Sequence, residues 1–202
     1  MANDTARTGV RPGTQIDFES CLLQVDASKQ WFARRVLPLT LEQLRWRPDP
    51  KSWSIGECLD HLNIALALYL PKVDDALARA RSGVPVGNRL HADWEMEVLR
   101  MVEPPVEVRL ESPTCTMPPV ATDPERLVES FHGTRDQYVR ALQQASRLDV
   151  TAVCIVEPIY PRIRSLGGTL AYLAAHDRRH IWQAERVRQA ARFPRAVGGE
   201  MV

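Results

Sequence analysis

The stretch AAHDRRHIW, residues 174–182, places His176 and His180 four positions apart in a segment with a helical pattern. Residues at this spacing lie on one face of a helix, so the two imidazoles point in the same direction. Neutral imidazole is a common ligand of divalent transition metals. The spacing therefore indicates part of a metal site, although two hydrogen-bonded core histidines would give the same pattern.

The same stretch is similar in spacing to the zinc-protease motif H-E-x-x-H, with Asp177 in place of the glutamate. In that motif the glutamate is the general base beside the metal-bound water. Asp177 is one methylene shorter and lies about 100° around the helix from His176, where we expect it to face solvent. Downstream, Glu185 falls on the outward face and Glu200 lies in a glycine-rich tail. We therefore do not favour a protease.

A better third ligand lies upstream, in the segment WSIGECLDHLNIALALYL at 53–70. His61 falls on the apolar face of this helical segment, and His176 and His180 fall on the apolar stripe of theirs. A bundle that packs these two faces together would bring one imidazole from the first helix to two from the second. Three histidines leave coordination positions open for water or substrate, as is typical of a catalytic metal site.

The elements that must position these histidines are helices. Four long stretches have the apolar periodicity of a helix, namely residues 15–37, 54–81, 123–146 and 165–193. Pro38 ends the first of them. Ser54, with Glu57 three residues later, has the pattern of a capping box. Asp123 followed by Pro124 is a strong start signal. The predicted fold is all-α, a four-helix bundle.

A long crossover, rich in proline and glycine, connects the second and third helices over residues 82–122, with a short helix expected around 91–101. Residues 147–164 contain one short β-branched segment without a second one nearby, so we expect no sheet. The predicted organisation is a flexible N-terminus, one bundle domain and a C-terminal tail: residues 1–14, 15–193 and 194–202.

The composition gives little reason to expect a charged macromolecular partner. The 202 residues carry 26 Lys and Arg against 25 Asp and Glu, a net charge of +1, so neither nucleic acid nor an acidic membrane is expected. The basic strip RVRQAARFPR at 186–195 is typical of a solvated helix end. The four cysteines are dispersed, and the longest apolar run, LNIALALYL, is too short to cross a bilayer. We expect a cytoplasmic protein.

Two motifs together resemble the DinB/YfiT-like superfamily of metal-dependent enzymes. RWRPDPKSWSIGECLDHL, residues 45–62, is similar to its Trp–Pro–W-S-I-x-E-x-L-x-H-L stretch, and GGTLAYLAAHDRRHIWQAERVR, residues 167–188, to its last helix. The resemblance implies a four-helix bundle with a long crossover. It also implies a divalent ion, nickel or zinc, bound by His61, His176 and His180. Members of the family include thiol-dependent S-transferases and isomerases and proteins described as hydrolases, and many form homodimers.

Three further residues could support such a site. Glu57, one turn before His61, could orient that imidazole, although its capping role at Ser54 is at least as good an account. Gln183 could hydrogen-bond a ligand water or make a helix-packing contact. Tyr172 could offer its hydroxyl to the site or be an ordinary core tyrosine.

Other chemically reactive side chains are better explained by structural roles. Cys58 could be a ligand or nucleophile, but a buried cysteine acting as a small apolar residue is the preferred interpretation. We expect Arg178 to form a solvated salt bridge. Arg179 lies closer to the face that carries the histidines and could bind an anionic substrate. His91 and His132 lie off the three-histidine pattern.

The leading hypothesis is a metal-dependent enzyme that acts on a small-molecule substrate. A three-histidine metal lowers the pKa of a bound thiol or water, which suits a thiol S-transferase or a hydrolase. No carboxylate stands out as a general base, which favours a low-molecular-weight thiol as co-substrate. The alternative is a non-catalytic, metal-stabilised bundle that serves in stress response or small-molecule binding. A metal-free protein would follow if His61 lay far from the other two histidines.

Overall fold

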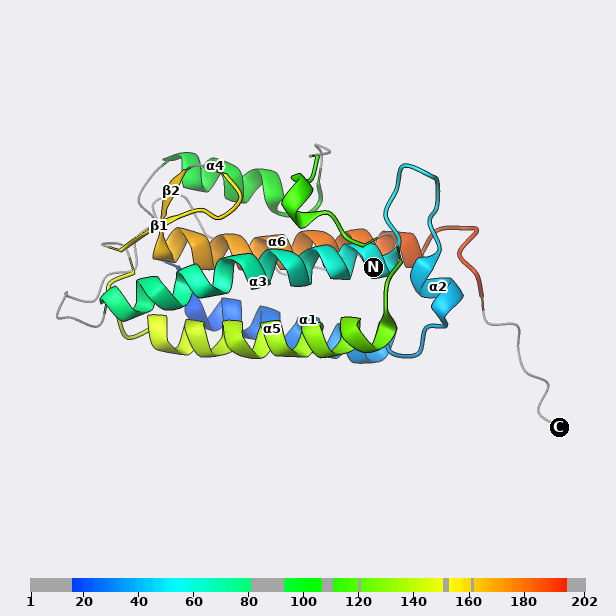
Figure 1. The fold of residues 1–202 in the computed structure, drawn as a ribbon, viewed down its shortest axis with the longest axis horizontal. Coiled ribbons are helices and arrows are strands. Elements are labelled where there is room, and N and C mark those ends of the chain that lie inside the picture. Colours follow the sequence, from blue (N-terminus) through cyan, green and yellow to red (C-terminus); the bar gives the residue numbers. More distant parts are fainter. Residues whose placement is uncertain are drawn as a thin grey trace, which may run out of the picture.

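The computed structural model describes residues 16–80, 93–106, 111–119, 121–150, 153–160 and 162–195. These residues form six α-helices: α1 Phe18–Arg35, α2 Leu41–Arg45, α3 Ile55–Ala80, α4 Asp93–Val102, α5 Pro124–Ala145 and α6 Leu166–Arg188. The long helices α1, α3, α5 and α6 lie alongside one another as a bundle (Figure 1). The predicted all-α fold is therefore confirmed.

The helices begin where the capping signals place them. The capping box of α3 is formed, since Ser54 Oγ accepts from the Glu57 amide at 3.2 Å and the Glu57 carboxylate accepts from the Ser54 amide at 2.8 Å. Asp123 caps α5, and the Ser165 side chain accepts from the Gly168 amide to cap α6. α3 continues through Pro71 to its end at Ala80.

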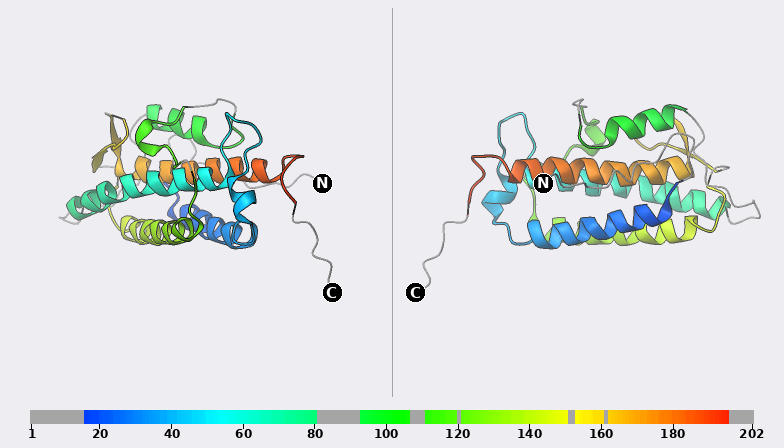
Figure 2. Two further views of the ribbon diagram at one scale, coloured as in Figure 1. Left: turned by 45° about the vertical axis from the view of Figure 1, so that its right-hand side comes forward. Right: turned by 180° about the vertical axis from the view of Figure 1, so that it is seen from behind.

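The bundle core is built around α3, which packs against both α5 and α6, while α1 packs against α5 and α6 from the other side (Figures 1 and 2). Phe32 of α1 and Phe131 of α5 are fully buried and stack with ring centroids 4.0 Å apart. Burying one such side chain contributes about 1.5–3 kcal/mol, so contacts of this kind fix how the helices pair.

The crossover covers one side of α6. Its helix α4 packs against α6, and a short 3₁₀ turn, η1 at Thr114–Thr116, contacts α3 (Figure 1). The predicted short helix is thus present, over 93–102. His91 lies outside the described residues.

Two local elements differ from the expectation. The helix α2 was not predicted, because five residues are too few to show a helical period; Thr40 and Gln43 start it with a capping box of their own. The prediction of no sheet was wrong: β1 Cys154–Val156 pairs antiparallel with β2 Ile163–Ser165. The second strand was missed because Arg164, at its centre, is a charged residue. That side chain is nevertheless 3% exposed and ion-paired with Glu157.

None of the described helices is both long enough and apolar enough to cross a membrane.

Candidate metal centre

Three imidazoles converge between α3 and α6. The Nε2 atom of His176 lies 3.2 Å from Nε2 of His61 and 3.1 Å from Nε2 of His180. All three side chains are buried, and their candidate ligand atoms lie within 4.8 Å of one another. The packing of α3 on α6 therefore brings His61 to the other two histidines, as the sequence predicts.

In two of these histidines the other ring nitrogen, Nδ1, lies within hydrogen-bond distance of an oxygen acceptor. Nδ1 of His61 lies 2.8 Å from the backbone carbonyl oxygen of Thr116, and Nδ1 of His180 lies 3.0 Å from Oε1 of Gln183. A carbonyl oxygen only accepts, so each Nδ1 must carry the proton and each Nε2 has a free lone pair. This is the hydrogen bonding that usually fixes the tautomer of a metal-binding histidine.

Burial keeps the three rings neutral. Desolvation lowers the pKa of His61 and holds the pKa values of His176 and His180 well below the ordinary range. The positive charge of Arg179 acts in the same direction on all three. Neutral imidazoles whose lone pairs face one another repel unless a cation or a proton lies between them.

The spacing of the nitrogens fits a metal ion. With metal–nitrogen bonds of about 2.0–2.1 Å, two ligand nitrogens lie about 3.3 Å apart at a tetrahedral angle and about 2.9 Å apart at a right angle. The two distances of 3.1 and 3.2 Å fall between these values. His61, His176 and His180 could therefore hold a divalent ion, and their neutral donors would leave its charge uncompensated.

Aromatic side chains enclose the three rings. The Trp53 ring lies with its centroid 4.9 Å from that of His61, and Tyr172 stacks on His176 at 5.4 Å with an interplanar angle of 20°. The Arg164 guanidinium lies 4.5 Å from the centroid of the Tyr172 ring. Burial raises the pKa of Tyr172 to about 12, so its phenol stays protonated at neutral pH.

A pocket of about 1060 Å³ opens beside the histidines. Its lining includes aromatic side chains from three parts of the chain (Trp53, Tyr160, Tyr172 and Trp182) and three cations (Lys51, Arg179 and Arg186). Glu111 is the only carboxylate among the described residues that line it. The crossover supplies part of the wall through Pro113, Thr116 and Met117. The centre therefore faces a pocket large enough for a substrate.

Three other candidates from the sequence are not part of the histidine group, namely Glu57, Cys58 and His132. The Glu57 carboxylate is bonded to Arg47 and to the Ser54 amide, and the group that contacts His61 Nδ1 is the Thr116 carbonyl. Cys58 is fully buried in the apolar core, where desolvation raises the pKa of its thiol well above the ordinary value. His132 packs edge-on against Phe32 and is not part of the histidine group.

Asp177 does not face solvent, so that expectation was wrong. Its side chain is buried and accepts from Arg135 Nη2 at 2.5 Å and from the Ser28 hydroxyl. The helical period alone assumes one buried face, whereas α1 packs on a second face of α6 and Arg135 of α5 contacts it there. Asp177 is thereby engaged away from the histidines and is not the base of a protease.

The two arginines that follow Asp177 contact the crossover. Arg178 makes a bidentate ion pair with Glu103, with N–O distances of 2.6 and 2.8 Å. Arg179 Nη1 donates to the Met101 carbonyl at 3.1 Å and lines the pocket. Of the residues around the centre, sequence reasoning missed Thr116, whose contribution is a backbone carbonyl that any residue type could supply.

Comparison with known proteins gave a family but no individual relative. No match was found among curated proteins or among solved structures. The sequence model of the DinB superfamily matches residues 24–184, which include all three histidines and run from within α1 to within α6. The chain therefore belongs to the DinB superfamily.

Proposed function

We propose that this protein is a metal-dependent enzyme that transfers a low-molecular-weight thiol to an electrophilic small molecule. The observation that carries the proposal is the convergence of three buried Nε2 atoms, 3.1 and 3.2 Å apart, at the wall of a pocket of about 1060 Å³. Because the three histidines are among the residues that line this pocket, a catalytic role is favoured over a purely structural metal. The family resemblance supports nickel or zinc as the ion.

The residues of the chain have distinct tasks in this proposal. His61, His176 and His180 would hold the ion, and the Thr116 carbonyl and Gln183 keep two of the rings oriented through their Nδ1 protons. When bound, a divalent ion lowers the pKa of a coordinated thiol or water and supplies the nucleophile at neutral pH.

The lining favours a thiol over water as the nucleophile. Hydrolysis of an amide or ester usually relies on a positioned general base. Among the described lining residues Glu111 is the only carboxylate, and Tyr172 remains protonated at neutral pH. A thiol deprotonates far more readily than water, so its activation needs no such base. Hydrolysis is accordingly the second candidate for the same centre.

The charge of the pocket indicates the kind of substrate. Among the described residues that line the pocket, Lys51, Arg179 and Arg186 are cations and Glu111 is the one carboxylate, so cations predominate. A divalent ion held by three neutral imidazoles would add to this excess. We therefore expect the thiol or the electrophile to carry a carboxylate or another anionic group, and the tryptophans to contact its apolar part.

The test is a turnover screen with protein loaded with nickel or zinc. Carboxylate-bearing thiols are paired with small electrophiles, and the loss of free thiol is followed in wild type and in His176→Ala. We expect turnover in the loaded wild type and background rates in His176→Ala and in chelated protein. Turnover that survives chelation would contradict the proposal, and ester hydrolysis without thiol transfer would favour the second candidate.

A further inference from the structure

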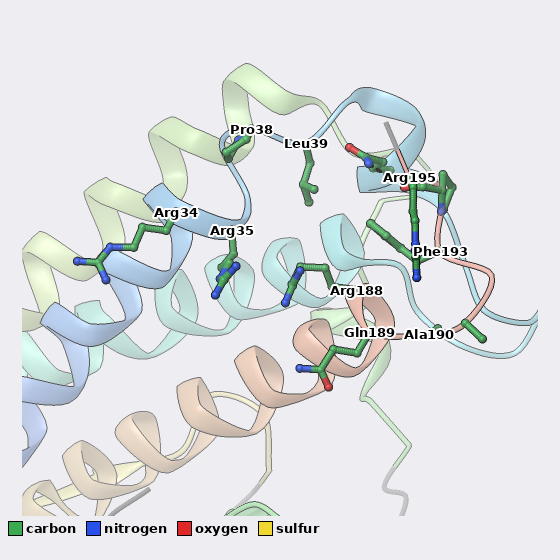
Figure 3. Close-up of a pocket in the computed structure, with 12 residues that line it drawn as sticks. Arg34, Arg35, Pro38, Leu39, Arg188, Gln189, Ala190, Phe193 and Arg195 are labelled. Atoms are coloured by element: carbon green, nitrogen blue, oxygen red, sulfur yellow. Dashed lines mark hydrogen bonds between the residues drawn. The ribbon is translucent and has the colours of Figure 1, made fainter. Parts of the chain in front are cut away.

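A second pocket, about 480 Å³ in volume, lies at the end of the bundle where α1 and α6 finish. It shares no lining residue with the pocket beside the histidines. Four arginines line it: Arg34 and Arg35 from α1, Arg188 from α6 and Arg195 from the segment after α6. The Arg34 side chain extends away from the other three (Figure 3). Leu39 and Phe193 add apolar surface. Gln43 and Gln189 also line the pocket, and their amide groups donate to the Pro194 carbonyl and to Glu185. No carboxylate among the described residues lines this arginine pocket.

The ion pairs nearby leave most of this charge uncompensated. Glu185 binds Arg188 through Nε at 2.9 Å and Nη2 at 2.5 Å, so it neutralises one of the four arginines. Arg34 Nη2 donates to the neutral Gln30 side chain at 3.4 Å. Among the described residues, no ion pair compensates the charges of Arg34, Arg35 and Arg195. The two helix C-termini contribute only about −0.5 elementary charge each, which does not cancel them.

The ordinary preference of cations for helix C-termini does not explain the whole cluster. It accounts for Arg34, Arg35 and Arg188, which lie in the last turns of α1 and α6. Arg195 comes after the helix has ended, in a segment that is anchored beside the pocket. Gln43 Nε2 donates to the Pro194 carbonyl at 2.8 Å, and Phe193 packs edge-on against Trp46 with ring centroids 5.6 Å apart. These contacts place a fourth arginine, Arg195, at the pocket.

We propose that this arginine pocket binds a small molecule that joins a phosphate or pyrophosphate group to an apolar or planar part. Planar guanidinium groups bind phosphate oxygens in a bidentate manner, which makes arginine the preferred residue for this task. The volume lies within the range of about 300–1,000 Å³ that is usual for small-molecule sites. Leu39 and Phe193 offer the surface for the apolar part.

Isothermal titration calorimetry with chelated, metal-free protein tests the proposal independently of the histidine centre. The probes are inorganic pyrophosphate, adenosine diphosphate and a short single-stranded RNA. We expect saturable one-to-one binding of pyrophosphate and tighter binding of adenosine diphosphate. In Arg35→Gln/Arg195→Gln, affinity should fall by at least about tenfold, since a hydrogen bond between charged groups contributes about 1.5–3 kcal/mol.

The matched control is Arg140→Gln/Arg147→Gln, which removes the same charge from exposed positions outside the pocket. Its affinity should equal that of wild type, and Arg35→Lys/Arg195→Lys, which keeps the charge, should lose less than the glutamine variant. Absence of saturable pyrophosphate binding, equal loss in the control, or binding of RNA alone would overturn the proposal. Equal affinities for pyrophosphate and adenosine diphosphate would overturn the role of Leu39 and Phe193.

Discussion

The carboxylate of Asp177 lies 2.5 Å from the guanidinium of Arg135, inside the bundle and one residue along the chain from His176. Arg135 is 1% exposed and also donates to Asn63 Oδ1 at 3.0 Å, so one buried network connects α3, α5 and α6. Ser28 extends it to α1 through its hydroxyl. The helix that carries two of the histidines is thus held in register by polar contacts as well as by apolar packing.

Removing one partner of this pair should destabilise the fold strongly. Arg135→Met leaves the Asp177 carboxylate buried without its cation, which costs about 3–5 kcal/mol in the free energy of unfolding. Urea unfolding followed by circular dichroism measures the change. Arg140→Met, an exposed position on the same helix, is the control and should change the free energy by less than about 0.5 kcal/mol. Equal effects of the two substitutions would contradict the role of the pair.

The buried histidines should make the stability of the metal-free protein depend on pH. Their folded-state pKa values are lowered by burial, while the unfolded chain takes up protons near pH 6.5. The unfolded state therefore binds more protons as the pH falls through about 6.5, and the stability present at higher pH is progressively lost below it. Urea unfolding at pH 7.5 and 5.5 should show the loss, and His176→Ala/His180→Ala should show a smaller one. An equal loss in that variant would assign the effect to other groups.

Gln183 should matter for metal affinity rather than for folding. Gln183→Leu removes the acceptor of the His180 Nδ1 proton and should weaken metal binding by about 10–100-fold. Gln183→Glu keeps an acceptor and should bind nearly as well as wild type, and the exposed Gln143→Leu serves as control. Competition with a zinc indicator measures the affinities. Unchanged affinity in Gln183→Leu would show that this hydrogen bond does not orient the ring.

We expect Arg179 to bind the anionic group of the substrate and not to contribute to metal binding. If the thiol-transfer function is correct, Arg179→Gln should raise KM for a carboxylate-bearing substrate by about tenfold or more, since it removes a charged hydrogen-bond donor from the pocket. Metal content should stay at the wild-type value. Arg192→Gln, an exposed position outside the pocket lining, is the control. A KM for the carboxylate-bearing substrate that is as low in Arg179→Gln as in Arg192→Gln would show that Arg179 takes no part in substrate recognition.

The sequence predicts the four long helices and the three-histidine group because both depend on local periodicity and capping. The apolar faces that carry His61 and His176 must be buried, and a bundle buries them against each other. The placement of Asp177 was missed because a helical wheel does not show how many neighbours cover a helix. The β1–β2 hairpin and the Thr116 carbonyl were missed for a related reason: three-residue strands and backbone acceptors have almost no side-chain signature.

Metal content tests the central claim most directly. Protein equilibrated with excess zinc or nickel and then desalted should contain one ion per chain by elemental analysis. His61→Ala, His176→Ala and His180→Ala should each retain far less, while His132→Ala, whose ring lies outside the group, should match wild type. Wild-type metal content in His61→Ala would contradict a centre built by α3 and α6 together.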